Sequence, residues 1–224
     1  KLRYMFGGKA QVPLVIRTMI GAGFGAAAQH SECLYSIFTH IPGLKTVVPS
    51  TPYDAKGLLI SAIRDNDPVI FFEHKLLYDM EGEVPEDSYT IPLGVADVKR
   101  EGKDVTIATV GRMVHFALEA AEKLSQDGVD VEVVDLRSLS PMDEDAILTS
   151  VKKTHRLIAL DEDYPRCSLA TDVVALVSGE VFDYLDAPPK MITAPHTPVP
   201  FSPVLEQAYI PSVDTIISTA QSLM

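Results

Sequence analysis

Short apolar runs alternate with stretches of helical periodicity along most of the 224 residues. The apolar runs predict buried strands at residues 12–16, 45–48, 68–72, 105–110, 131–136 and 157–160. Apolar side chains at the spacing of one helix face predict helices over residues 30–38, 55–63, 114–124, 143–153, 169–185 and 213–220. Continuous apolar strands separated by helices indicate parallel sheets covered on both faces, so we expect an α/β fold.

The alternation is interrupted over residues 75–93, which contain one glycine, two prolines and several acidic residues and are predicted to form a linker. This divides the chain into a first unit, residues 1–93 with the linker included, and a second unit, residues 94–224. The first unit has fewer strands than a complete unit of this kind, and we expect that its beginning is missing. The proline-rich residues 195–203 are expected to be non-helical.

Composition narrows the class of protein. With 46% hydrophobic and 22% charged residues, the chain has enough apolar surface to fold, and no apolar run approaches the ~18 residues of a membrane span. Two cysteines, Cys33 and Cys167, are too few for a disulfide framework and are expected to be free thiols. We therefore expect a cytoplasmic protein, or one of the mitochondrial matrix in a eukaryote, with no membrane partner.

The net charge of -12 argues against a nucleic-acid partner. Residues 1–94 hold 8 basic and 10 acidic side chains, whereas residues 95–224 hold 11 basic and 21 acidic ones. Two interpretations remain open for the acidic second unit: a surface that keeps the protein in solution, or a docking face for a basic partner.

The strongest candidate for chemistry is the sequence GAGFG with its glycines at positions 21, 23 and 25, followed closely by His30. A glycine-rich turn between a strand and a helix predicts close approach of the backbone to a ligand, although neither a dinucleotide nor a Walker pattern is present. His30 is either a core histidine or a proton-transferring group in a cleft. The other histidines are scattered, no metal-ligand spacing occurs, and the acidic residues 161–163 are expected to lie in a solvated loop.

Several segments together resemble the β subunits of thiamine-diphosphate-dependent acetoin and 2-oxo-acid dehydrogenases. In chain order they are IRTMIGAGFGAAAQHS, FTHIPGLKTVVPSTPYDAKGLL, AIRDNDPVIFFEHKLLYDMEGEVP, VDLRSLSPMD and PHTPVPFSP, the last followed by LEQAYIP. The resemblance covers essentially the whole chain. The segments FTHIPGLK, STPYDAKGLL and PHTPVPFSP are most similar to the acetoin members, with the pyruvate and branched-chain members as near alternatives.

The resemblance implies a fold and an assembly. Residues 1–93 correspond to the later part of an incomplete thiamine-diphosphate pyrimidine-binding domain, and residues 94–224 to a transketolase C-terminal-like α/β domain. The implied assembly is an α2β2 heterotetramer with a β–β dimer at its centre. In it, the α subunit holds Mg2+ and the diphosphate, and the β subunit holds the aminopyrimidine. The subunit-binding domain of a dihydrolipoyl acyltransferase would dock on the C-terminal domain.

The resemblance also assigns residues. His30, within QHS, matches the active-site histidine that faces cofactor and substrate, so it is expected to be both catalytic and cofactor-binding. The glutamate that activates the pyrimidine belongs to a segment before residue 1, and no metal ligand is expected here. Glu32 replaces the usual glutamine, and it is expected either to raise the pKa of His30 or to face solvent.

The implied activity is cleavage of acetoin, with transfer of the acetyl group to a lipoyl arm. Two alternatives remain. One is oxidative decarboxylation of pyruvate or a branched-chain 2-oxo acid. The other is that this chain by itself is a non-catalytic interaction module, and we expect the isolated chain to be inactive.

Overall fold

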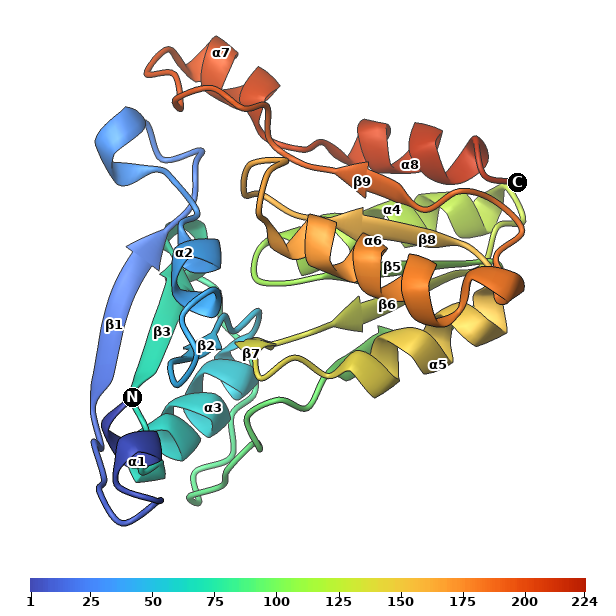
Figure 1. Ribbon diagram of the computed structural model, residues 1–224. Helices are drawn as coiled ribbons and strands as arrows, with labels where there is room; N and C mark the ends of the chain where they lie inside the picture. The colour runs from blue at the N-terminus through green and yellow to red at the C-terminus, as the bar shows by residue number, and fades with distance from the viewer.

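The computed structural model describes residues 1–224 and contains two mixed β-sheets flanked by helices (Figure 1). The first sheet, on the left in Figure 1, has the strand order β1-β3-β2-β7, and the second has the order β4-β6-β5-β8-β9. None of the helices has the length and apolar character that crossing a membrane requires.

The first sheet combines strands from both halves of the chain. Strands β1 (Val15–Ile20), β3 (Val69–His74) and β2 (Lys45–Val47) are parallel, and β7 (Ser138–Ser140) pairs with β2 in the antiparallel sense. The long helix α3 (Pro52–Arg64) packs on one face through a small core of its own. β1 is an edge strand of this sheet.

The second sheet is built around β5 (Val105–Thr109), which is fully buried. Parallel strands lie on both sides of it, namely β6 (Val131–Asp135), β8 (Leu157–Leu160) and β9 (Lys190–Ile192). The strand β4 (Asp97–Arg100) is antiparallel to β6 and forms one edge. Helices α4 (Met113–Gln126) and α8 (Val213–Gln221) cover one face. Helices α5 (Glu144–Thr154) and α6 (Leu169–Glu180) cover the other.

The remaining elements are short. They are the helices α1 (Leu2–Met5), α2 (Tyr35–Thr39) and α7 (Pro203–Tyr209), and the 3-10 turns η1 (Ala28–His30), η2 (Lys75–Leu77) and η3 (Phe182–Tyr184). In Figure 1, α7 lies near the upper end of β1, close to the turn that follows that strand.

Local sequence explains where the long helices begin. The Thr51 side chain accepts a hydrogen bond from the Asp54 amide at 3.1 Å, and Pro52 occupies the first helical position of α3. Ser168 and Thr171 form a reciprocal capping box at the start of α6. These side chains satisfy amides that a helix N-terminus leaves unpaired.

The predicted strands and long helices are confirmed with local corrections. The first strand begins at Val15 instead of residue 12, because Pro13 has no amide to donate to a ladder. The helix expected over residues 30–38 is wrong in length: only η1 and the five residues of α2 are helical. The helix expected over residues 169–185 ends at Glu180. The sheets are also not purely parallel, because the short strands β4 and β7 run antiparallel.

The two sheets share one core. A cluster of 20 buried residues joins Ile70 and Phe72 of the first sheet to Val134 and Ala159 of the second. The two halves of the chain are held together by this cluster and by the pairing of β7 with β2. The division at residues 93 and 94 stays a prediction.

Candidate functional site

An open groove of about 660 Å³ lies beside the first sheet. Its floor is formed by Ile70 and Phe72 of β3, and Ile16 of β1 and Phe38 of α2 contribute to its walls. These four side chains are apolar and continue the shared core toward solvent. The groove is therefore mainly apolar. Polar side chains enter it where β1 and β3 end, namely Gln29, His30, Glu32 and Lys75.

His30 is the last residue of η1 and its side chain is exposed. Its carbonyl oxygen accepts a hydrogen bond from the Lys75 ammonium group, which fixes the backbone on that side. The imidazole is therefore part of the groove lining and is not packed in the core. His30, Leu34 and Phe38 line the same groove, although no continuous helix joins them.

The glycine turn (residues 21–27) binds carboxylates of the same chain. The Ala22 amide donates to Glu162 Oε1 at 2.8 Å, and the Gly23 amide donates to Glu206 Oε1 at 2.7 Å. The Gly25 amide donates to Glu206 Oε2 at 3.1 Å. The expectation of close backbone approach to a ligand is corrected here, because the second unit supplies the anions that these amides bind.

Glu162 is buried and also binds His74 of β3, with 3.0 Å between Oε2 and Nε2. The Leu76 amide donates to His74 Nδ1 at 3.2 Å, so the imidazole proton is on Nε2 and is donated to Glu162. Burial raises the pKa of Glu162, but the hydrogen bonds from His74 and the Ala22 amide, together with the charge of Arg112, outweigh burial and lower it.

Residues 161–163 do not lie in a solvated loop, and that expectation was wrong. All three carboxylates are buried where the two units meet. Asp161 accepts a hydrogen bond from the Tyr35 hydroxyl, and Asp163 accepts one from the Ser36 hydroxyl at 2.6 Å. Burial, together with the charge of Asp163, raises the pKa of Asp161 to about 7. The burial of this acidic run was not predictable because its partners in the first unit are 88 to 140 residues away in sequence.

Glu32 is half-buried and lines the groove. Its Oε1 accepts a hydrogen bond from the Tyr164 hydroxyl at 2.7 Å, which links the His30 segment to the second unit. Burial and this hydrogen bond raise the pKa of Tyr164 to about 12. Glu32 is thus held by a phenol near the groove.

A second buried polar cluster connects the units farther from His30. Asp54 accepts hydrogen bonds from Lys99 at 2.8 Å and from Arg137 at 3.2 Å. Asp135 accepts a hydrogen bond from the Ser50 hydroxyl, and burial raises the pKa of Asp135 to about 7. These groups pair with one another, so the cluster is structural.

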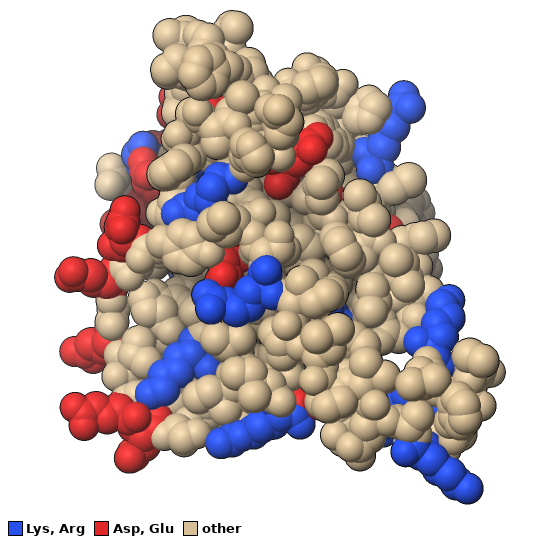
Figure 2. Space-filling view, turned by 90° about the vertical axis from the view of Figure 1, so that its left-hand side faces the viewer, with Lys and Arg blue, Asp and Glu red and all other residues tan.

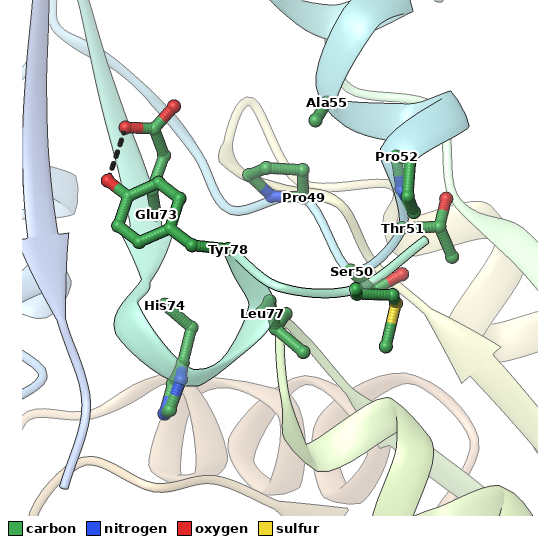
Figure 3. Close-up of a pocket in the computed structure, with 10 residues that line it drawn as sticks. Pro49, Ser50, Thr51, Pro52, Ala55, Glu73, His74, Leu77 and Tyr78 are labelled. Carbon is green, nitrogen blue, oxygen red and sulfur yellow. Dashed lines mark hydrogen bonds between the residues drawn. The ribbon is translucent and has the colours of Figure 1, made fainter. Parts of the chain in front are cut away.

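A smaller pocket of about 190 Å³ lies at the carboxyl ends of β2 and β3 (Figure 3). Glu73 and Tyr78 face each other there, and the Tyr78 hydroxyl donates to Glu73 at 2.9 Å. Arg17 also donates to both oxygens of Glu73, at 2.7 and 3.0 Å. Figure 3 shows His74 pointing away from this pair. Because its one carboxylate is fully paired, this pocket is a weaker candidate than the groove.

The face of the molecule that carries β1 is mostly uncharged (Figure 2). Acidic side chains line one edge of it, and basic ones are scattered over its middle and along the opposite edge. Large apolar side chains are exposed in and next to β1, among them Leu14, Ile16, Met19 and Phe24. The groove therefore opens on an apolar face.

The acidic excess of the second unit is partly internal. Six of the 21 acidic side chains in residues 95–224 are buried: Glu132, Asp135, Asp161, Glu162, Asp163 and Glu206. One of the 11 basic side chains, Arg137, is buried too. The outer surface thus carries about half of the excess that the composition indicated.

Both cysteines are free thiols, Cys33 buried and Cys167 exposed. Nowhere do three or more His, Cys, Asp or Glu side chains converge in the geometry of a metal site.

The fold places the chain in the transketolase class. Residues 1–81 match the family "Transketolase, pyrimidine binding domain" and residues 94–216 match "Transketolase, C-terminal domain". A solved structure titled "Split gene transketolase, inactive beta4 tetramer" aligns with a TM-score of 0.77, covering 95% of this chain and 67% of its own. At 23% identity, that likeness concerns the fold alone.

Within this class, the chain belongs to the family of the acetoin and 2-oxo-acid dehydrogenase β subunits. It is 67% identical to the subunit beta of acetoin:2,6-dichlorophenolindophenol oxidoreductase from Bacillus subtilis (strain 168), and 61% identical to the subunit of the same name from Cupriavidus necator. It is 47% identical to the pyruvate dehydrogenase E1 component subunit beta of B. subtilis. All of this chain aligns, with 66%, 66% and 69% of the three proteins.

The resemblance read from the sequence is thereby confirmed, and so are the two transketolase-type parts of the fold. The chain spans just under two thirds of the length of the two acetoin relatives. Sequence reasoning had missed the roles of Glu162, Glu206 and Lys75 around the turn. The only available signal was the position of Glu206 inside LEQAYIP, a segment that carries the resemblance.

Proposed function

We propose that this chain is part of the β subunit of a thiamine-diphosphate-dependent enzyme that cleaves acetoin and passes the acetyl group to a lipoyl arm. The observation that carries the proposal is the gradient of identity. The two acetoin relatives are 67% and 61% identical, against 47% for pyruvate dehydrogenase and 44% for 2-oxoisovalerate dehydrogenase of B. subtilis.

The groove supports a role in holding the cofactor. Its apolar lining fits the aromatic rings of thiamine diphosphate, and His30 is exposed beside it. When bound, thiamine diphosphate supplies the nucleophilic and electron-accepting chemistry that breaks the substrate's C–C bond. We assign Mg2+ and the diphosphate to the α subunit, as the family resemblance implies.

His30 would face the cofactor and substrate. An exposed imidazole is able to hold or transfer a proton at a ring nitrogen. The backbone around it is fixed by Lys75 on one side and by the glycine turn on the other. Ile70 and Phe72 would exclude water from the reacting atoms once the groove is covered.

The proposed partners are those of the family. The relatives are named as beta subunits, which supports assembly with an α subunit, in an α2β2 heterotetramer that includes a β–β contact. The lipoyl arm would belong to a dihydrolipoyl acyltransferase, whose subunit-binding domain would dock on the acidic second unit.

The test is to assemble the complete β subunit with its α subunit and to follow the reduction of 2,6-dichlorophenolindophenol. We expect acetoin-dependent reduction that requires both thiamine diphosphate and Mg2+. The present chain alone, given the same components, should show no turnover. Reduction that persists without thiamine diphosphate would contradict the proposal, as would full activity of the isolated chain.

A further inference from the structure

The glycine turn that precedes His30 belongs to the first unit, but the carboxylates that bind its amides belong to the second. Glu162 follows β8 and Glu206 lies on α7. Both side chains are buried, with 5% and 3% of their surface exposed, although a carboxylate is seldom buried without a specific partner. The glycine turn supplies that partner.

Each of the two carboxylates binds different amides of the turn. Glu206 accepts the amides of Gly23 and Gly25, the latter with both oxygens at 3.3 and 3.1 Å. Glu162 accepts the amide of Ala22. Gly23 and Gly25 have positive φ angles of 97° and 70°, which lie outside the helix and strand regions. No regular secondary structure therefore holds this segment in place.

Hydrogen-bond donors next to the carboxylates and the turn complete the arrangement. His74 donates to Glu162, and Arg112 donates to the Ala22 carbonyl at 3.4 Å. A flexible glycine segment would otherwise sample many conformations, and fixing it requires interactions that offset the lost entropy. Charge-assisted hydrogen bonds to buried carboxylates are strong enough to do so.

We propose that Glu162 and Glu206 are positioning residues that fix His30 in the groove, so that proton transfer by His30 depends on contact between the two units. The proposal rests on the proposed function of His30. The physical reason is geometric, because a displacement of about 1 Å at a reacting group lowers the rate by up to about 10²-fold.

The test uses Glu206→Gln and Glu162→Gln in the complete α2β2 assembly. A carboxamide keeps the size of the side chain and one acceptor oxygen, but it loses the negative charge and replaces the second acceptor oxygen with an NH2 donor. We expect kcat to fall about tenfold or more, with a smaller change in KM. In a His30→Ala background the same substitutions should lower kcat no further, because they act through His30.

The matched control is Glu132→Gln. Glu132 is also a buried carboxylate of the second unit, and it accepts the Gly102 amide at 3.1 Å and the Ser150 hydroxyl at 2.5 Å, both within that unit. It does not contact the glycine turn. Glu132→Gln should leave kcat unchanged even if it lowers the melting temperature.

Hydrogen–deuterium exchange provides a readout that does not depend on activity. Residues 21–30 should exchange faster in Glu206→Gln than in the parent or in Glu132→Gln, while β5 stays protected. Unchanged exchange there, or losses in kcat that simply add to that of His30→Ala, would overturn the positioning role alone. Full activity of His30→Ala would instead overturn the proposed function of His30, and the positioning role with it.

Discussion

Replacing His30 by alanine in the complete assembly is expected to lower kcat about 10²–10⁴-fold, the usual contribution of a general acid or base. The imidazole is exposed beside the groove, so its removal leaves no cavity in the core. Affinity for thiamine diphosphate should change much less, because the α subunit is expected to supply most contacts to the cofactor.

The matched control for that experiment is His40→Ala, at another exposed histidine, which does not line the groove. Steady-state kinetics with acetoin and titration of the cofactor measure the two effects separately. Equal activity of both variants would remove His30 from the mechanism.

Gly21 is the residue of the turn least able to accept a side chain. Its φ angle is 102°, and an added Cβ would lie 2.0 Å from His74 Nε2. Gly21→Ala should therefore lower the free energy of unfolding by about 2 kcal/mol or more, since backbone strain of about 1–2 kcal/mol adds to the displacement of His74. Urea denaturation measures this.

Gly128→Ala separates backbone strain from crowding. Gly128 also has a positive φ angle, 82°, but nothing lies within 4 Å of its added Cβ. Its alanine variant should be destabilised by the strain alone and thus less than Gly21→Ala. Equal losses would show that His74 is not held against the turn.

The loop after β8 and the segment around α2 make a pH-dependent contact through Tyr35 and Asp161. Because the pKa of Asp161 is raised to about 7 in the folded protein, the folded state binds more protons than the unfolded state between about pH 4 and pH 7. This group therefore lowers the stability progressively as pH rises through that window. Asp135 acts in the same direction.

Asp161→Asn should remove the contribution of Asp161. The difference in free energy of unfolding between the parent and this variant should be smaller at pH 8 than at pH 5. We expect the two differences to differ by about 1 kcal/mol or more. Chemical denaturation at the two pH values measures it, with Asp183→Asn on the exposed η3 turn as control. A loss that is the same at both pH values would contradict the assignment.

Long elements were predictable because their signals are local. Helix α3 has a capping threonine, a proline at its first position and a continuous apolar stripe, and its span follows from these. The segment around α2 has the same apolar spacing, yet its side chains pack across to the second unit and only five residues are helical. The short strands β4, β7 and β9 have too few residues to show a period.

At the scale of the whole molecule, the part of the site that sequence could not predict is the part made by contact between the units. His30 and the glycines are neighbours in sequence, whereas Glu206 is more than 180 residues away from the amides that it accepts. The burial of residues 161–163 was not predictable for the same reason, because their partners lie in the first unit. Charge alone does not tell a buried, paired carboxylate from a solvated one.

The acidic surface leads to a prediction about docking. The association rate of the complete assembly with the basic subunit-binding domain of the acyltransferase should fall severalfold between low and moderate salt, because salt screens charges beyond about 10 Å at 0.1 M. The effect should be moderate, since six of the acidic side chains of the second unit are buried. Surface-immobilised kinetics at several ionic strengths measure it. A rate independent of salt would leave the acidic surface with a role in solubility only.

The central claim, that the chain is part of an acetoin-cleaving β subunit, is tested most directly by comparing substrates in one assembly. The measurement is kcat/KM of the complete α2β2 protein for acetoin, pyruvate and a branched-chain 2-oxo acid, with the same artificial acceptor. We expect the value for acetoin to exceed the other two by about tenfold or more, because specificity is a ratio of kcat/KM values set by the shape of the site. A higher value for pyruvate or for the branched-chain acid would contradict the claim.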